Sequence, residues 1–274
     1  SVTVDVTASE GQALIHRLVR HCDVVIQNFK VGGLAKYGLD YRSLSASNPA
    51  IVYCSISGFG QTGPNTHRPG YDLLAQAYGG MMSLTGERNG EPMKVGVGIA
   101  DVMCGMYAAT AILAALRHRD DTGEGQHIDL GLVDTQISWL INSGTNYLVS
   151  GAPQNRMGNQ HPNIVPYQVF AAEDGHLIVA VGNDAQFARF CAVLGQAELA
   201  KTENYRSNQM RLKNREKLIP LLSAEMIKWN RDALVTALDK ANVPSGAIHN
   251  VKDVFASDQV EARDMKISMA HPAA

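Results

Sequence analysis

One carboxylate stands where it could carry out acyl chemistry. Asp101 lies in KVGVGIADVMCGMYAATAILAAL, which starts at residue 94, between a glycine-rich segment and a run with no other charge. An Asp before a helix commonly caps it by accepting backbone N–H groups. A carboxylate in a dry, glycine-lined pocket can instead attack an activated acyl group and form a covalent intermediate. From these residues alone capping is favoured, and a nucleophile remains the alternative.

The surroundings of Asp101 bear on that alternative. Gly96, Gly98 and Ala100 remove bulk beside it. The helix predicted from Val102 to Leu116 is apolar on every side and is therefore expected to be buried. The positive end of the helix dipole would then favour the ionised form of the carboxylate.

A second pattern, GFGQTG, contains Gly58, Gly60 and Gly63. It matches GxGxxG, which binds a dinucleotide pyrophosphate where a strand turns into a helix. Pro64 follows at once and no helix is expected there, so dinucleotide binding is disfavoured. The glycines let the loop turn sharply, and its free N–H groups could approach a ligand closely.

The sequence carries no other familiar catalytic or metal-binding pattern. It has no nucleophile elbow, no zinc-protease helix motif, no P-loop and no cluster of His, Asp and Glu with metal spacing. His127 and Asp129 alternate on a short predicted strand, where polar structural contacts are the favoured interpretation. The four cysteines are isolated, which indicates neither a zinc site nor a redox pair. We therefore expect no metal and no tightly bound cofactor.

Composition favours a soluble protein that acts on a small molecule. The 274 residues are 45% hydrophobic and 18% charged, with a formal net charge of −2. Nucleic acids and anionic membranes require clustered Lys and Arg, so neither is expected as a partner. The longest uncharged run, Val102 to Leu116, is shorter than the roughly 18 apolar residues of a membrane span. Isolated thiols indicate a cytoplasmic protein, or one of an organelle matrix in a eukaryote.

Strands and helices alternate along the first 150 residues. Apolar runs predict strands at SVTVDV, DVVIQNF, AIVYCSIS, MKVGVGIA and HIDL. Helices are expected from Ser9, with Gln12 completing a capping box, at about 102–118 and at about 132–148. This alternation predicts an α/β, Rossmann-like large domain over residues 1–150 with a mostly parallel sheet. Its ligands would bind beyond the carboxyl ends of the strands, where QNF, SGFGQTGP and AD lie.

Beyond residue 150 the pattern is that of a smaller α+β domain. Residues 151–165 are polar and turn-rich, and a linker or mobile loop is expected there. Residues 166–255 are predicted to begin with a hairpin that turns at Glu173, Asp174 and Gly175. Helices are expected to follow at about 184–194, 211–228 and 231–241, the last capped by Asn230.

Four segments together resemble a known family. NPAIVYCSISGFGQTGP, RPGYDLLAQAYGGMMSLTGE, VGVGIADVMCGMYAATAILAAL and TGEGQHIDLGLVD follow the order and spacing of the family III CoA-transferases, the formyl-CoA and carnitine CoA-transferase group. The resemblance spans essentially the whole chain. It implies an enzyme that moves coenzyme A between carboxylic acids, with coenzyme A thioesters as substrates and two identical subunits interlocked like links. Family members carry a segment before SVTVDV and a C-terminal return into the large domain, which residues 256–274 would begin. Both are expected to be truncated here.

The resemblance also implies roles for particular residues. Asp101 takes the place of the family's nucleophile. Asn28 and Phe29 fall on its contact to coenzyme A. Lys36 stands where relatives often have Arg and could meet a phosphate as a point charge.

The segment NRMGNQHPN carries further expected site residues. The family's mobile loop over the active site corresponds to Gly158, Asn159 and Gln160, and N–H groups of this loop would stabilise oxyanions. The region resembles the succinyl-CoA:glutarate type, so succinyl-CoA and a small dicarboxylic acid are the expected substrates. Arg156 could pair with the distal carboxylate, or it could be a surface linker residue.

Two other functions stay open. The α-methylacyl-CoA racemases share the fold but have a His in a GHD version of PGYD, where it acts as a proton-transfer base. Here that residue is Tyr71, followed by Asp72, and both are expected among the substrate and coenzyme A contacts. The Tyr ranks racemase well below transferase. The second alternative is an inactive, truncated homologue that binds coenzyme A.

Overall fold

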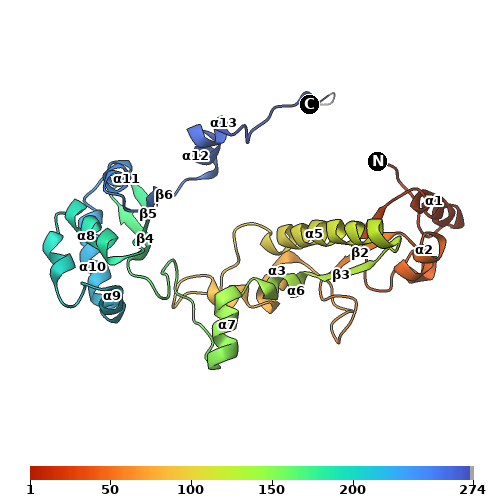
Figure 1. Cartoon of the computed structure of the whole chain (residues 1–274), viewed down its shortest axis with the longest axis horizontal. Coiled ribbons are helices and arrows are strands. Elements are labelled where there is room, and N and C mark those ends of the chain that lie inside the picture. The colour runs from red at the N-terminus through yellow and green to blue at the C-terminus, as the bar shows by residue number, and fades with distance from the viewer. Residues whose placement is uncertain (272–274) are drawn as a thin grey trace. The chain divides into compact units, whose positions relative to one another are not determined.

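The computed structural model describes residues 1–271, which divide into two compact units, residues 1–158 and the residues from 159 on. Figure 1 labels the helices and strands of both units. The division falls inside the segment 151–165, for which a linker or loop is predicted.

A parallel three-stranded sheet forms the centre of the first unit. Its strands are β1 (Val24–Gln27), β2 (Val52–Ser57) and β3 (His127–Gly131), in the order β1-β2-β3. The register pairs Val24 with Val52 and Tyr53 with His127. The central strand β2 has a neighbour on each edge and is largely buried, which explains its continuous apolar run. A mixed α/β fold with a parallel sheet is thereby confirmed.

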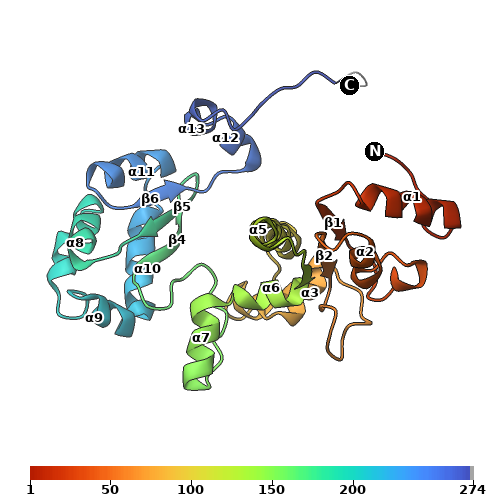
Figure 2. The ribbon, with the colours of Figure 1, turned by 45° about the vertical axis from the view of Figure 1, so that its right-hand side comes forward.

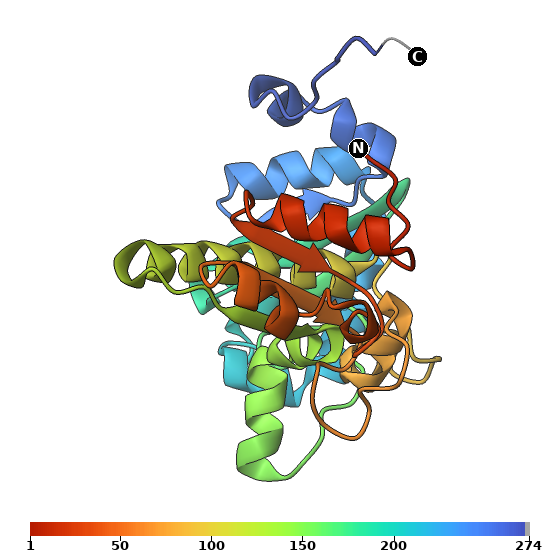
Figure 3. The ribbon, with the colours of Figure 1, turned by 90° about the vertical axis from the view of Figure 1, so that its right-hand side faces the viewer.

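Helices cover both faces of this sheet. The helices of the first unit are α1 (Ser9–Val19), η1 (Ala35–Tyr37), α2 (Tyr41–Ser47), α3 (Asp72–Tyr78), α4 (Met81–Leu84), α5 (Ile99–Thr122), α6 (Leu132–Ser138) and α7 (Ile141–Ser150). Figure 2 shows α1 and α2 on one side of β1 and β2 and α5 on the other, and Figure 3 presents the α1 side. Two buried clusters result. Leu44 and Tyr53 belong to the first, and Ala100, Cys104 and Leu132 belong to the second.

The predicted strand SVTVDV is wrong. Residues 1–5 have no regular structure, and no strand among residues 1–271 pairs with them. Without a neighbour, the N–H and C=O groups of a strand stay unpaired, which explains the irregular conformation. The helix α1 begins at Ser9 as predicted, but the capping box is wrong. Its N-cap is Ala8, no side chain caps it, and Gln12 Nε2 donates to Val6 O at 3.1 Å.

The predicted strand MKVGVGIA is also wrong. Residues 91–95 have no regular structure, residues 96–97 form a bend, and α5 begins at Ile99. The Val95 N–H, which a strand would give to its neighbour, is donated to Gln76 Oε1 at 2.8 Å. Gly96 and Gly98 weaken strand formation further. As a result, Asp101 is the third residue of the helix and does not precede it.

The helix α5 is less buried than its composition predicts. Its buried residues form one stripe on the sheet side, made of Ala100, Cys104, Ala108 and Ala115. On other faces Val102, Met106 and Leu113 are 58%, 61% and 68% exposed. The expectation of a fully buried helix is therefore wrong, because β2, β3, α3 and α6 cover only part of its surface. By length and composition alone α5 could also cross a membrane, two criteria that a core helix satisfies equally.

An antiparallel sheet packed on helices forms the second unit. Its strands are β4 (Tyr167–Ala172), β5 (Gly175–Ala180) and β6 (Ser245–Ala247), in that order. The predicted hairpin is confirmed, with Glu173 and Asp174 between the paired residues Ala172 and Gly175. The helices are α8 (Asp184–Val193), η2 (Ala197–Lys201), α9 (Asn208–Lys213), α10 (Arg215–Met226), α11 (Arg231–Lys240), α12 (Val251–Phe255) and α13 (Asp258–Ala262).

Caps explain where two of these helices begin and end. Asn230 caps α11 as predicted, because its side chain accepts the N–H groups of Asp232 and Ala233. The single helix predicted over 211–228 is instead two helices that meet at Asn214. The Asn214 side chain donates to Met210 O at 2.9 Å, an interaction with the preceding turn that competes with a continuous helix.

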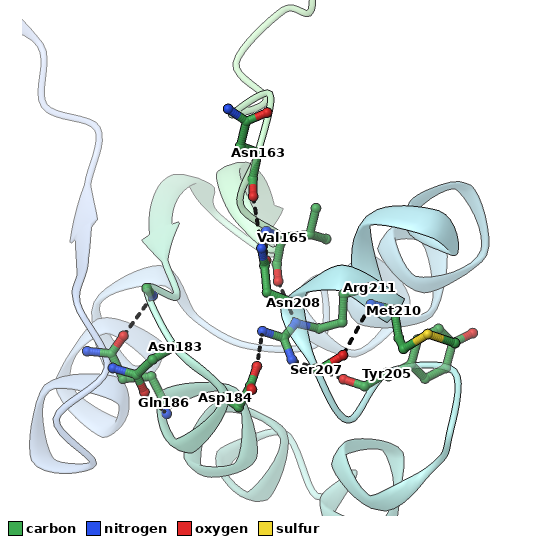
Figure 4. A network of polar contacts seen from close by, with 11 residues as sticks. Asn163, Val165, Asn183, Asp184, Gln186, Tyr205, Ser207, Asn208, Met210 and Arg211 are labelled. Carbon is green, nitrogen blue, oxygen red and sulfur yellow. Dashed lines mark hydrogen bonds and ion pairs between the residues drawn. The ribbon is translucent and has the colours of Figure 1, made fainter.

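A buried arginine organises the second unit around Val165 (Figure 4). Arg211 is 0% exposed and donates to Val165 O, Tyr205 O and Asp184 Oδ1 at 2.7, 3.0 and 2.8 Å. Its guanidinium carbon lies 4.4 Å from the ring centroid of Phe187. These bonds tie the end of the segment 151–165 to the helices α8 and α9.

Candidate active site

The carboxylate of Asp101 is exposed at the N-terminal end of α5. The N-cap residue of this helix is Gly98, which has no side chain that could accept the N–H groups of the first turn. Asp101 accepts no hydrogen bond from any residue between 1 and 271, so its carboxylate has no protein partner there. The interpretation of Asp101 as a helix cap is therefore wrong.

The capping bond comes from another helix. Asp72, the first residue of α3, accepts the Ala100 N–H on Oδ1 at 2.8 Å. That N–H is one of the donors that a helix cannot satisfy from its own backbone. The other oxygen of Asp72 accepts a hydrogen bond from Gln76 Nε2 at 2.7 Å. Asp72 thus fills the role that the sequence favours for Asp101.

The site raises the pKa of Asp101. Partial burial is the larger cause, and the negative charge of Asp72 adds to it. A Cβ atom placed on Gly98 would stand 3.8 Å from both Asp72 Oδ1 and Asp101 Oδ2, so the two carboxylates approach the same point beside Gly98. The expected effect of the helix dipole, which lowers the pKa of an acid, is outweighed here.

A cavity of about 480 Å³ gathers three of the predicted contacts. Its lining includes Asn28, Phe29 and Tyr71. Asn28 follows β1 and donates its Nδ2 to Ile56 O at 2.8 Å, which fixes the turn beyond the strand. Phe29 and Tyr71 are 53% and 68% exposed and leave apolar surface for a ligand.

Two further residues of this cavity were missed from the sequence. Ser57, at the carboxyl end of β2, lines it with an Oγ that has no hydrogen-bond partner among residues 1–271. The signal was present, because Ser57 ends a strand just before the glycine loop. Arg68 also lines the cavity, and its guanidinium carbon lies 5.0 Å from the ring centroid of Phe59. A basic residue here would suit an anionic ligand.

The other predicted residues of the first unit, Asp101 included, are not among the residues that line this cavity. Lys36 is exposed, is not among the lining residues, and holds its Nζ 4.6 Å from the ring centroid of Tyr37. Arg156 donates to Glu87 O and Gly90 O at 3.2 and 2.6 Å, so it holds a turn. Both side chains therefore have contacts within the protein, and their predicted roles toward a phosphate and a carboxylate stay predictions.

The predicted active-site loop is held at both ends. The Gly158 N–H donates to Gly86 O at 3.0 Å, and Gly158 has a φ of 60°. Asn159 and Gln160 belong to the second unit, where Gln160 Oε1 accepts a hydrogen bond from Arg215 at 3.2 Å. The Gly158 amide would have to release Gly86 before it could stabilise an oxyanion.

As predicted from the sequence, the GFGQTG loop does not continue into a helix. A Cβ atom on Gly58 would stand 2.5 Å from the Cα of Gly70, so Gly58 allows two loop segments to cross closely. Nearby, His127 Nε2 lies 2.9 Å from Ser55 Oγ, and Asp129 accepts the Gln61 N–H. These are the polar contacts predicted for the strand. No group of three metal-ligating side chains occurs within residues 1–271.

Proteins with a parallel α/β sheet usually bind their ligands beyond the carboxyl ends of the strands, and the cavity lined by Asn28 and Ser57 lies there, as in an α/β ligand-binding protein. The model of CoA-transferase family III matches residues 1–274, and the chain belongs to that family. The predicted resemblance is confirmed.

Relatives and solved structures agree with this family. The chain is 49% identical over 269 residues to the succinate–glutarate CoA-transferase of Agrobacterium fabrum, covering 98% of this chain and 67% of the relative. It is 38% identical to the succinyl-CoA:glutarate CoA-transferase of Mus musculus, covering 99% of this chain and 62% of the relative. The crystal structure of a CAIB/BAIF family protein from Brucella suis superposes with a TM-score of 0.89 at 51% identity, covering 97% of this chain and 71% of that one. The chain therefore spans about two thirds of the length of these proteins.

Proposed function

We propose that the protein transfers coenzyme A from succinyl-CoA to a small dicarboxylic acid, with Asp101 as the nucleophile. The observation that carries this proposal is the unpaired Asp101 carboxylate, since Asp72 supplies the bond to the first turn of α5. A carboxylate that accepts no hydrogen bond keeps its lone pairs available for attack.

The reaction proceeds by exchange of acyl bonds at Asp101. A carboxylate oxygen attacks the thioester carbonyl, the C–S bond breaks, and an anhydride and the coenzyme A thiolate form. The thiolate attacks the aspartyl carbonyl and releases succinate, which leaves an aspartyl thioester. The acceptor carboxylate then attacks this thioester to give a second anhydride and free thiolate. Attack of the thiolate on the acceptor's acyl carbon forms the new thioester and restores Asp101.

The cavity at Asn28, Phe29 and Tyr71 supports coenzyme A binding in the first unit. Its exposed aromatic surface suits the apolar stretches of the substrate, and Arg68 suits a phosphate or carboxylate. In this proposal coenzyme A is a substrate that enters and leaves as a thioester. Gly158, the last residue of the first unit, would supply an oxyanion contact from the loop once its N–H is released from Gly86.

The choice of succinyl-CoA and a dicarboxylic acceptor rests on the names of the relatives. The Agrobacterium and mouse proteins are named for succinate or succinyl-CoA and glutarate. Arg156 is the proposed partner of the distal carboxylate. Its Nε and one Nη are committed to backbone carbonyls, and the other Nη makes no hydrogen bond within residues 1–271.

We further propose that two copies form an interlocked dimer. Support comes from apolar residues that the described chain leaves uncovered. Leu113 of α5 is 68% exposed, and Leu148 and Val149 of α7 are both 84% exposed. Uncovered apolar surface of this kind is typical of protein–protein contacts. Light scattering of the intact protein tests this, and a monomeric mass would refute it.

An acceptor panel tests the substrate assignment. The intact protein is given succinyl-CoA with monocarboxylic and dicarboxylic acids of similar length, and the same panel is run on Arg156→Ala and on the exposed control Arg117→Ala. We expect a preference for dicarboxylates, and a raised acceptor KM for dicarboxylates in Arg156→Ala alone. Equal use of both acid classes, or an unchanged acceptor KM, contradicts the assignment.

A further inference from the structure

Asp72 uses both carboxylate oxygens within the first unit. Oδ1 accepts the Ala100 N–H at 2.8 Å, and Oδ2 accepts Gln76 Nε2 at 2.7 Å. Gln76 is 0% exposed, and its Oε1 accepts the Val95 N–H at 2.8 Å. One carboxylate thereby connects to both ends of the segment 95–100, directly at Ala100 and through Gln76 at Val95.

Ala100, at the end of this segment, is 1% exposed and packs in the buried cluster with Cys104 and Leu132. The part of the segment that precedes α5 has few other restraints. It belongs to no strand, and it contains Gly96 and Gly98. Glycine has more conformational freedom to lose on folding than any other residue. Core packing of Ala100 and the bonds that Asp72 accepts together hold the first turn of α5, and the direction in which Asp101 projects depends on both.

We propose that Asp72 is a positioning residue that fixes the first turn of α5 and leaves the Asp101 carboxylate free to attack. The proposal rests on the proposed function, because it presupposes that Asp101 is the nucleophile. It also changes the role expected for Asp72 from the sequence. Asp72 is not among the residues that line the cavity beside Tyr71, and its oxygens are occupied by the protein.

The charge of Asp72 gives this role a measurable signature. The elements packed against α5 carry several titratable groups: Asp72 on α3, Cys54 on β2, His127 and Asp129 on β3, and Asp134 on α6. Among the described residues, the charge that acts on Asp101 is that of Asp72, which adds to burial in raising the pKa of Asp101. Loss of the Asp72 charge should lower that pKa.

Two substitutions in the intact protein separate position from charge. Asp72→Asn keeps an oxygen that can accept the Ala100 N–H and removes the charge. Asp72→Ala removes both. The matched control is Glu10→Gln, which removes an acid from the first turn of α1. For each protein we would measure kcat and the acyl-CoA KM for CoA transfer from pH 4 to 8.

The acid limb of the kcat profile, set by ionisation of Asp101, should move to lower pH in both Asp72 variants and stay in place in Glu10→Gln. Asp72→Ala should also lose about 100-fold in plateau kcat at unchanged acyl-CoA KM, the size of effect that a 1 Å misplacement produces. Asp72→Asn should lose less. The proposal is overturned if the acid limb of the pH profile of kcat stays in place in Asp72→Asn. It is also overturned if a folded Asp72→Ala protein has the kcat of the wild type. Absence of CoA transfer in the unaltered protein would instead refute the proposed function.

Discussion

Asp72 and Asp101 both approach Gly98, where an added Cβ atom would stand 3.8 Å from an oxygen of each. Each oxygen of Asp72 accepts one hydrogen bond, whereas Asp101 accepts none from residues 1–271. The pair thereby divides two tasks, the capping of a helix and the presentation of a carboxylate without hydrogen bonds. Asp72 satisfies the helix, and Asp101 is left available for chemistry.

The environment of Asp101 predicts that its ionised carboxylate lowers the free energy of unfolding at neutral pH. Burial and the charge of Asp72 raise the pKa of Asp101 in the folded protein. The folded state therefore holds that proton more tightly than the unfolded chain. The resulting stabilisation is fully present below the pKa of the unfolded side chain and is lost as the pH rises through the folded pKa. At neutral pH Asp101 is ionised, and the wild-type protein no longer has this stabilisation.

Asp101→Asn should therefore be at least as stable as wild type at pH 7, and its advantage should shrink toward pH 3. Thermal unfolding of the two proteins at both pH values gives the comparison. Glu10→Gln should show the opposite sign, because hydrogen bonds from its own backbone N–H and from Ser9 lower the pKa of Glu10. A lower Tm for Asp101→Asn than for wild type at pH 7 would show that the carboxylate supports the fold.

Substitution of Arg211 should destabilise the second unit. Arg211→Ala leaves the carbonyls of Val165 and Tyr205 without their donor, and each buried unsatisfied group costs about 1–3 kcal/mol. We expect a loss of about 3 kcal/mol or more in the free energy of unfolding, measured with denaturant. Lys201→Ala, which removes an exposed ion pair with Glu198, is the control and should change little. Equal effects of the two substitutions would contradict the role of Arg211.

Because Tyr71 stands where the racemases have a His, we expect no racemase activity. A racemase of this fold needs a base that works near neutral pH, and a Tyr hydroxyl is a poor substitute for the imidazole of His. The intact protein incubated with a chiral 2-methylacyl-CoA in deuterated water should give no exchange at the α-carbon by mass spectrometry. Transfer of CoA from succinyl-CoA in the same preparation is the positive control. Appreciable exchange would contradict the transferase proposal.

Much of the fold was predictable because it is encoded locally. The strands β1, β2 and β3, the hairpin at Asp174 and the cap at Asn230 follow from apolar runs and turn residues that lie next to one another in the sequence. The strand predicted before Asp101 failed because Val95 bonds to Gln76, a side chain 19 residues away. No local pattern contains that contact.

The environment of Asp101 was less predictable for the same reason. Its place after glycines and before an apolar helix marked it as a candidate, but the bond from Ala100 to Asp72 spans 28 residues. The exposure of Val102 and Leu113 likewise depends on which elements cover α5, and composition does not specify this. Ser57 and Arg68 join Tyr71 around one cavity only once the loops after β2 are folded.

The central claim is that Asp101 forms a covalent acyl intermediate. The intact protein is incubated with succinyl-CoA and hydroxylamine, which converts an aspartyl anhydride or thioester into a hydroxamate, and the peptides are analysed by mass spectrometry. A hydroxamate should appear on Asp101 and be absent from Asp101→Asn, which should be folded and inactive. A hydroxamate on another residue, or near-normal turnover by an Asp101→Asn protein verified as free of deamidation, would contradict the claim.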